Sequence, residues 1–293
     1  FTQHYPQPGW VEHEPMDLVD TTVRAMRQAL STGGIQPKEI AAIGITNQRE
    51  TTLIWDRKTG QAIHRAIVWQ CRRTAPIIER LKQDGLTEMI RDKTGLVPDA
   101  YFSASKIRWL LDQTGTQARA ERGELCFGTV DSFLAWHLTG GQTHVTDATN
   151  AARTMLFNLK EQDWDDDLLR VFNIPRVLLP QVKDTAGVIG TLDERCLGQA
   201  IPIAALAGDQ HAALFGQGCL EEGAVKNTYG TGCFMLMNTG ARPVRDERGL
   251  LTTMAWRLNG KPMYALEGSV FVAGAAIQWL RDELGLISTA AQS

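Results

Sequence analysis

Segments typical of helices and segments typical of strands alternate along most of this chain, and this alternation limits the possible folds more than any other feature. Apolar residues at helical spacing predict helices over 15–30, 74–82, 103–113, 130–138 and 164–172. Short runs rich in Ile, Val, Leu and Thr predict strands over 40–46, 52–56, 143–147, 154–158 and 201–206. Strands that alternate with helices predict an α/β fold.

The pattern changes after Gly218. Runs with strand character follow one another at 224–228, 234–238, 251–256 and 263–266. The pair Gly268-Ser269 then introduces an expected helix over 272–284. We therefore divide the chain into a first domain, 1–217, and the beginning of a second, 218–293.

Charge and cysteine usage exclude several classes of protein. The 30 Lys and Arg residues are balanced by 33 Asp and Glu residues, so the basic excess typical of nucleic-acid binding is missing. The longest apolar run, Val270 to Leu280, is too short to insert into a membrane. Five scattered cysteines form no C-x-x-C motif, which favours free thiols in a reducing compartment over zinc ligands. We expect a cytoplasmic protein and, because the chain begins at Phe1, a piece of a longer one.

Arg49 and Glu50 are neighbouring charges in the connection between two expected strands. They are either a solvated hairpin tip or a clamp for a polyol, because a guanidinium donates and a carboxylate accepts hydrogen bonds from adjacent hydroxyls. Trp69 is either a core residue or part of a ligand pocket. Tyr101 precedes an expected helix, where its hydroxyl could face a cleft.

Asp209 follows an apolar strand and precedes a helix. It is either a helix N-cap, worth about 1 kcal/mol, or a carboxylate that accepts a hydroxyl proton. Ligands of open α/β sheets bind at the carboxyl ends of strands, which favours the second interpretation.

The segment Thr228 to Phe234 is glycine-rich. It is either a turn that uses positive φ at Gly230 and Gly232 or a phosphate cradle that includes the Thr231 hydroxyl. The chain contains neither a Walker A motif nor G-x-G-x-x-G, so P-loop and Rossmann mechanisms lack support.

Together these segments resemble the FGGY carbohydrate kinase family over nearly the whole chain. The runs that carry the resemblance are YPQPGWVEH (5–13), ITNQRET (45–51), IVWQCRRT (67–74), YFSASK (101–106), AGDQ (207–210) and NTYGTG (227–232). The resemblance implies an actin-like, ribonuclease-H-like fold with a cleft between two domains. It also implies ATP-dependent phosphorylation of glycerol to sn-glycerol 3-phosphate in glycerol catabolism, with Mg²⁺ beside ATP, in a homo-oligomeric enzyme.

The resemblance also implies roles for individual residues. Hydrogen bonds to the glycerol hydroxyls would come from Arg49, Glu50, Tyr101, Asp209 and Gln210. Trp69 and Phe234 would pack against the glycerol carbons, and Asp209 would be the general base and contact Mg²⁺. Nucleotide-binding positions would be Thr231, Gly274 and Gln278.

Two alternatives stay open. A related kinase for a pentulose or for erythritol would share the cleft but needs a larger pocket, and the bulk of Trp69 and Phe234 favours a three-carbon substrate. The chain could also be an inert fragment that only binds ligand.

The chain departs from the family pattern in three places. The family's opening strand with its Asp-x-Gly-Thr phosphate loop does not occur in the chain, and neither does the later part of the second domain, which supplies much of the adenine pocket. Bacterial members bind fructose 1,6-bisphosphate at a loop that carries Gly and Arg. Here that loop reads Cys196 to Ala200, with Ala200 in place of the arginine, which argues against this regulation.

Overall fold

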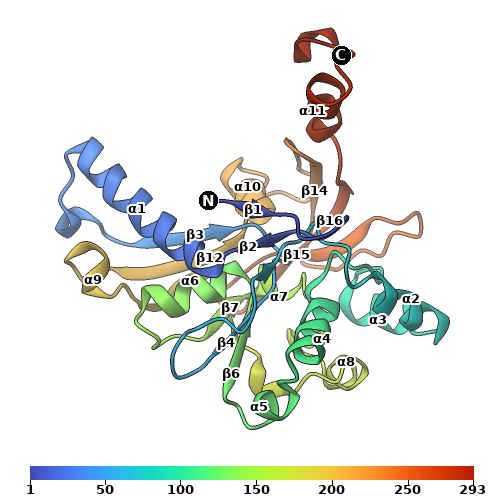
Figure 1. Cartoon of the computed structure of the whole chain (residues 1–293), viewed down its shortest axis with the longest axis horizontal. Helices are drawn as coiled ribbons and strands as arrows, with labels where there is room; N and C mark the ends of the chain where they lie inside the picture. The colour runs from blue at the N-terminus through green and yellow to red at the C-terminus, as the bar shows by residue number, and fades with distance from the viewer.

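Two parallel strands organise the first part of the molecule (Figure 1). The computed structural model describes residues 1–293. Strand β3 (Ile43–Asn47) runs parallel to β12 (Pro202–Gly208), and β11 (Ala186–Thr191) pairs antiparallel with the other side of β12. The register places Asn47 opposite Gly208, so both strands end at the same sheet edge. The loops that follow them therefore start side by side.

Smaller sheets surround this pair. They consist of β1 (Gln3–His4), β2 (Glu12–His13) and β5 (Ala66–Ile67); β4 (Leu53–Asp56) and β6 (Leu125–Gly128); β7 (Val145–Asp147) and β10 (Gln181–Lys183); and β8 (Phe157–Asn158) and β9 (Asp163–Trp164). The helices of this part are α1 (Pro15–Gly33), α2 (Ala75–Gln83), α3 (Thr87–Thr94), α4 (Ser103–Thr114), α5 (Gln117–Glu121), α6 (Val130–Leu138), α7 (Ala148–Ala151), α8 (Asp166–Val171), α9 (Glu194–Leu197) and α10 (Asp209–Gly216). The predicted α/β class is confirmed.

Local signals explain where several helices begin and end. Pro15 occupies the first position of α1, where its missing N–H costs nothing, and Gly34 ends the helix with a φ of 65°. Helix α8 begins later than predicted because the Asp165 side chain accepts hydrogen bonds from the backbone N–H groups of Asp167 and Leu168.

The hairpin-tip interpretation of the connection between the first two expected strands, 40–46 and 52–56, is wrong. Strand β3 pairs with β12, whereas β4 pairs antiparallel with β6. The connection 48–52 is therefore a junction between two sheets and lies inside the molecule, not at a solvated tip. The strand predicted over 154–158 shrinks to β8, because α7 and a turn occupy the residues before it.

The second part is an antiparallel sheet with the order β13–β14–β16–β15, formed by β13 (Val225–Tyr229), β14 (Cys233–Gly240), β15 (Leu251–Leu258) and β16 (Lys261–Val270). The antiparallel strands predicted after Gly218 are confirmed. Gly268 and Ser269, predicted to introduce a helix, remain within β16 because they pair with Met235 and Phe234.

Buried apolar side chains join the two parts. The larger core cluster contains Ile54, Ile67 and Leu110 from the first part together with Met254 and Tyr264 from β15 and β16. A second cluster lies under α1 and α6, around Leu18, Trp55 and Phe133. The antiparallel sheet is therefore packed directly against the first part of the chain.

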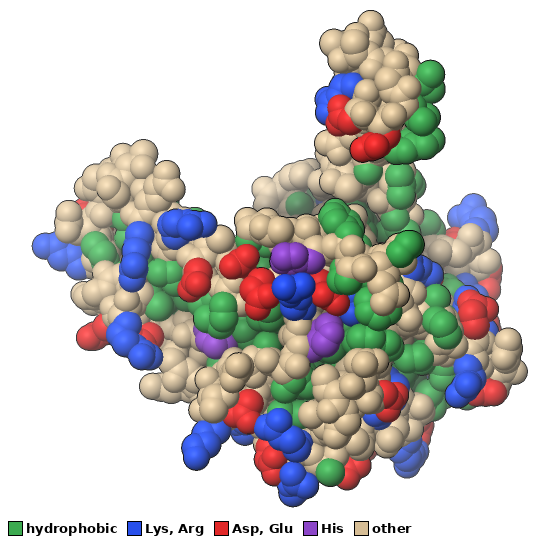
Figure 2. Space-filling model, viewed as in Figure 1, with side chains coloured by type: hydrophobic (Ala, Val, Ile, Leu, Met, Phe, Trp, Pro, Cys, Tyr) green, Lys and Arg blue, Asp and Glu red, His purple; other side chains and the backbone are tan.

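Helix α11 (Gly274–Asp282) forms an arm that stands clear of the rest of the molecule (Figure 1). None of its residues is buried, and Figure 2 shows hydrophobic side chains along one side of the arm. Trp279 and Leu286 are among the exposed apolar residues of this region. No helix of the chain has both the length and the apolar character that a membrane span requires.

Candidate active site

A small pocket opens at the shared edge of β3 and β12. Its volume is about 50 Å³, enough for only a few water-sized groups. The lining contains Gln48 and all the residues that were predicted to bind substrate. It consists of Gln48, Arg49, Glu50, Trp69, Tyr101, Asp209, Gln210 and Phe234. The structure thus brings together residues from five separate segments of the sequence.

The backbone before the pocket is held in an unusual conformation. Glu50 has a φ of 61°, which is uncommon for a residue with a side chain. Its carbonyl oxygen accepts hydrogen bonds from the hydroxyls of Thr52 (3.0 Å) and Ser103 (3.2 Å). These contacts offset the conformational cost and turn the side chains of Arg49 and Glu50 toward the site.

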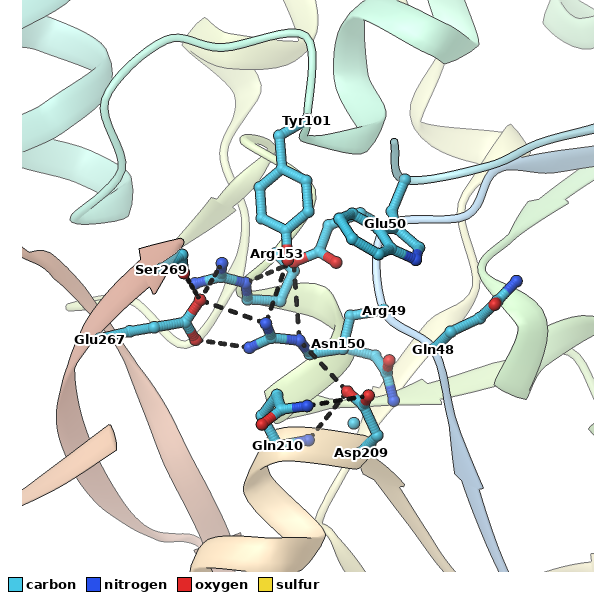
Figure 3. Close-up of polar contacts among 12 residues, drawn as sticks. Gln48, Arg49, Glu50, Tyr101, Asn150, Arg153, Asp209, Gln210, Glu267 and Ser269 are labelled. Atoms are coloured by element: carbon cyan, nitrogen blue, oxygen red, sulfur yellow. Dashed lines mark hydrogen bonds and ion pairs between the residues drawn. The ribbon is translucent and has the colours of Figure 1, made fainter. Parts of the chain in front are cut away.

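A buried cluster of alternating charges forms one wall (Figure 3). Arg49 donates from Nη1 to Glu267 Oε2 (2.5 Å) and from Nη2 to Glu267 Oε1 (3.2 Å) and to the Tyr101 hydroxyl (3.1 Å). Arg153 donates from Nε to Glu50 Oε1 (2.7 Å) and from Nη2 to Glu267 Oε1 (2.9 Å). Two guanidinium groups and two carboxylates therefore balance each other out of contact with water.

The two carboxylates of this cluster titrate differently. Burial alone would raise the pKa of Glu267, but Arg153 and Arg49 outweigh that effect and hold this pKa well below its ordinary value. Burial raises the pKa of Glu50 despite the opposing effect of Arg49 and Arg153. Glu267 is thus the firmly ionised partner of both arginines, and Glu50 is the more basic carboxylate facing the pocket.

Asp209 is the first residue of α10, and it does not cap that helix. Gly208 is the N-cap residue, and no side-chain capping hydrogen bond forms, so the N-cap interpretation of Asp209 is wrong. The carboxylate accepts hydrogen bonds from the backbone N–H of Gln210 (2.8 Å) and from its side-chain Nε2 (3.1 Å). It lies 3.5 Å from Arg49 Nε and is 43% exposed at the pocket.

Aromatic rings form the opposite wall. Trp69 makes edge-to-face contacts with Tyr101 (5.8 Å between ring centroids) and with Phe234 (5.9 Å). Phe271 lies 4.9 Å from Tyr101 and 6.3 Å from Trp69. Trp69 is therefore a half-buried pocket residue, and the hydroxyl of Tyr101 faces the charged cluster as well as the cleft.

The predicted nucleotide-binding residues lie at the base of α11. Gly274 N donates to Gly230 O (3.0 Å), and the Thr231 carbonyl accepts from Ala273 N (2.8 Å). Gln278 follows one turn along the same helix and is exposed. The structure therefore brings Thr231 and Gly274 together and places Gln278 nearby on the arm.

Glycine is required here by close approach of the backbone. Gly230 and Gly232 do not adopt the positive φ expected from the sequence. A Cβ atom at Gly232 would lie 2.6 Å from Val270 O, and one at Gly274 would lie 2.5 Å from Gly230 O. This turn exposes bare backbone with the Thr231 hydroxyl, which is the surface that a phosphate group requires.

The residues also fit a magnesium ion of the kind that accompanies a nucleotide. No group of three or more His, Cys, Asp or Glu side chains in the chain could hold a metal ion by itself. Mg²⁺ in kinases is instead bound by one or two carboxylates together with substrate phosphates. The accessible carboxylate of Asp209 is a suitable ligand of that type.

Sequence reasoning missed four residues of this site, Gln48, Arg153, Lys226 and Glu267. The buried Lys226 ammonium contacts Gln210 Oε1 and donates to Thr228 Oγ1 (3.0 Å) and to Phe234 O (3.1 Å). Gln48 stands next to Arg49 in a run already singled out, so its position was a usable signal. Glu267 and Arg153 lie in ordinary strand and loop contexts that carry no such signal.

Lys106, behind the pocket, leads to a prediction about stability. It is fully buried, and its ammonium contacts the carbonyl oxygens of Tyr101 and Phe102. Burial lowers the pKa of Lys106 to about 7. The unfolded chain keeps this proton up to about pH 10.4, so Lys106 by itself should contribute a rise of about 2 kcal/mol in the free energy of unfolding between pH 7 and pH 9.

Urea unfolding of the wild type and of Lys106→Met at both pH values checks this prediction. Lys226, whose pKa burial and Arg49 lower to about 8, acts in the same direction, so the substitution should reduce the pH dependence without abolishing it. An identical pH dependence in the two proteins would contradict the assignment to Lys106.

Comparison with known proteins gives these residues a family context. The model of the N-terminal domain of the FGGY family of carbohydrate kinases matches residues 1–216, and the model of the C-terminal domain of that family matches residues 225–293. A curated relative from Thermotoga maritima, glycerol kinase 2, is 57% identical over 294 residues, which cover 100% of this chain and 59% of the relative. The chain therefore spans about three fifths of the length of that relative.

Solved structures agree with this result. The crystal structure of Plasmodium falciparum glycerol kinase with ADP has a TM-score of 0.91 at 35% identity, covering 99% of this chain and 59% of the other. A ligand-bound xylulose kinase from Lactobacillus acidophilus has a TM-score of 0.85 at 21% identity, covering 99% and 58%, which shows a shared fold. On the match of the N-terminal domain model over residues 1–216, the chain belongs to the FGGY family of carbohydrate kinases.

Proposed function

We propose that this chain is the substrate-binding part of an ATP-dependent glycerol kinase that forms sn-glycerol 3-phosphate. The observation that carries the proposal is the small pocket in which hydrogen-bonding groups face aromatic rings. A triol requires both donors and acceptors at short spacing, and its carbon side requires an apolar surface. The identity to glycerol kinase 2 of Thermotoga maritima supports the same substrate.

The proposed clamp uses the edges of these side chains that line the pocket. Arg49 holds Glu267 and Tyr101 with its terminal nitrogens, so its Nε edge is the part that faces Asp209 and the pocket. Glu50 offers a carboxylate acceptor, and Gln210 offers an amide. Trp69 and Phe234 would pack against the glycerol carbons and leave little room for a longer sugar.

Asp209 is the proposed general base. Its exposed carboxylate would accept the proton of the attacking hydroxyl while the clamp holds that hydroxyl in line with the γ-phosphate of ATP. Mg²⁺, held by Asp209 and phosphate oxygens, would neutralise charge on the transferred group. Because the pocket is small and walled by aromatic rings, bound glycerol would exclude water that could otherwise accept the phosphoryl group.

The nucleotide would lie on the other side of the cleft. The backbone around Thr231 and Gly274 would approach its phosphates, and Gln278 would contact it from α11. This arrangement corresponds to a domain division at 217/218, with substrate and nucleotide held mainly by different domains. We further propose that the enzyme is cytoplasmic, as its cysteine usage favours, and homo-oligomeric, as the family resemblance implies.

A substrate panel tests the proposal. The full-length protein that contains this chain should phosphorylate glycerol with a kcat/KM on the order of 100-fold above that for erythritol or xylulose, because a tight apolar wall discriminates by about 10- to 200-fold per extra methylene. A coupled assay of ADP release measures all three. A higher kcat/KM for xylulose than for glycerol would indicate a related sugar kinase instead. No turnover with any of the three substrates would refute the proposal.

The 293-residue chain by itself should show no measurable turnover with glycerol and MgATP. The Asp-x-Gly-Thr loop of the family does not occur in its sequence. Without that loop a main set of phosphate contacts is missing. The measurement is the same ADP assay on material purified from a host without its own glycerol kinase, and turnover there would show that the phosphate site is assembled differently.

A further inference from the structure

The proposed base lies close to two cations, which poses a problem for its chemistry. Arg49 Nε is 3.5 Å from Asp209 Oδ1, and the Lys226 ammonium contacts Gln210, the neighbour of Asp209. Arginine binds carboxylates best through two parallel hydrogen bonds. If Arg49 bound Asp209 in that way, the lone pairs that a substrate proton requires would be occupied.

The structure shows what holds Arg49 away from this arrangement. Glu267 binds both terminal nitrogens of Arg49, at 2.5 Å and 3.2 Å, and so leaves only the Nε edge toward Asp209 (Figure 3). Lys226 is held in a similar way by Gln210 Oε1, Thr228 Oγ1 and Phe234 O. Each cation beside the base therefore has its hydrogen bonds directed to other acceptors.

Glu267 is well suited to this task because its own position is fixed. It is 1% exposed, and it accepts further hydrogen bonds from Arg153 Nη2 (2.9 Å) and Ser269 Oγ (2.9 Å). Three of the four contacts end on Oε1 and one on Oε2, so both oxygens of the carboxylate are held. Ser269 stands two residues further along β16, on the same face of the sheet, so the strand itself supports the contact.

We propose that Glu267 is a positioning residue of the kinase reaction, which holds the guanidinium of Arg49 so that the Asp209 carboxylate stays available to the substrate hydroxyl. This inference rests on the proposed role of Asp209 as the base. Glu267 comes from the second domain, whereas Arg49 follows β3 in the first. The position of Arg49 in the site therefore depends on how the two domains pack against each other.

The test uses Glu267→Gln in the full-length protein. Glutamine keeps the shape and one acceptor oxygen but removes the charge, so Arg49 should turn its terminal nitrogens to Asp209. We expect kcat with glycerol to fall about 10- to 100-fold per folded molecule. Glu12→Gln is the matched control, because Glu12 is also buried and paired with an arginine, Arg73, at 2.8 Å, but lies outside the pocket. That control should keep kcat within about threefold.

A double-mutant cycle with Asp209→Asn separates positioning from a purely structural role. If Glu267 acts through Asp209, adding Glu267→Gln to Asp209→Asn should lower kcat by less than about threefold. An equal loss of kcat in both backgrounds would overturn the proposal, as would a Glu267→Gln enzyme within threefold of the wild type. If Glu267→Gln does not fold, Glu267→Asp is tested in the same double-mutant cycle. Aspartate keeps the negative charge but carries it on a side chain that is one methylene shorter. Failure of the proposed function itself would be visible separately, as an Asp209→Asn enzyme that keeps its kcat.

Discussion

Asp209→Asn in the full-length protein should fold normally, bind glycerol and lose about 10²- to 10⁴-fold in kcat. Asparagine is almost the same size as aspartate, and its amide oxygen can still accept the hydrogen bond from Gln210 N. The substitution removes the negative charge and with it the proton acceptor. Helix α10 should not suffer, because Gly208 and not Asp209 is its N-cap residue.

Turnover is measured beside thermal melting and equilibrium binding of glycerol, so that loss of structure is not mistaken for loss of chemistry. Asp193→Asn provides a matched control, because Asp193 accepts a hydrogen bond from Arg195 N at the start of α9 and is not part of the pocket lining. That variant should keep full kcat. A well-folded Asp209→Asn protein with more than a tenth of the wild-type kcat would refute the role of the general base.

Arg153→Met should lower the free energy of unfolding by about 3–5 kcal/mol. The Arg153 side chain is completely buried, binds Glu50 and Glu267, and lies over the ring of Phe102 at 5.2 Å. Methionine fills much of the space but leaves two buried carboxylates with Arg49 as their single guanidinium. An uncompensated buried charge costs far more than the loss of an exposed pair.

Denaturant unfolding of the chain measures this effect. Arg170→Met is the control, because Arg170 is 77% exposed and pairs only with Asp167 on the surface of α8. That substitution should change the free energy of unfolding by less than about 1 kcal/mol. A loss below 1 kcal/mol for Arg153→Met would mean that the cluster relaxes or takes up water when one cation is removed.

Elements with strong local signals could be predicted from the sequence. Helices α1, α4 and α6 follow the spacing of their apolar residues, and Gly34 ends α1 in the left-handed conformation that glycine favours. The pairing of strands could not be predicted in the same way. The short connection after β3 looked like a hairpin, but each strand binds a more distant partner, β12 or β6.

The candidate site shows the same limit. Residues within recognisable runs, such as Arg49 and Asp209, could be named from the sequence, and the pocket brings them together. Arg153 and Glu267 could not, because they lie 103 and 218 residues away from the side chains that they bind. Contacts between residues so far apart in the sequence depend on how the two sheets pack, and no local sequence pattern encodes that packing.

The two walls of the pocket also suggest how such an enzyme could be redesigned. The charged wall is interlocked, since each member of the Arg49, Glu50, Arg153 and Glu267 cluster depends on the others for neutrality. The aromatic wall is modular, since Trp69 and Phe234 come from separate elements and meet only edge to face. Exchange of Trp69, which contacts Tyr101 and Phe234 edge to face, should therefore disturb the ionic framework less than exchange of Phe234, because the guanidinium of Arg49 lies over the Phe234 ring at 5.7 Å.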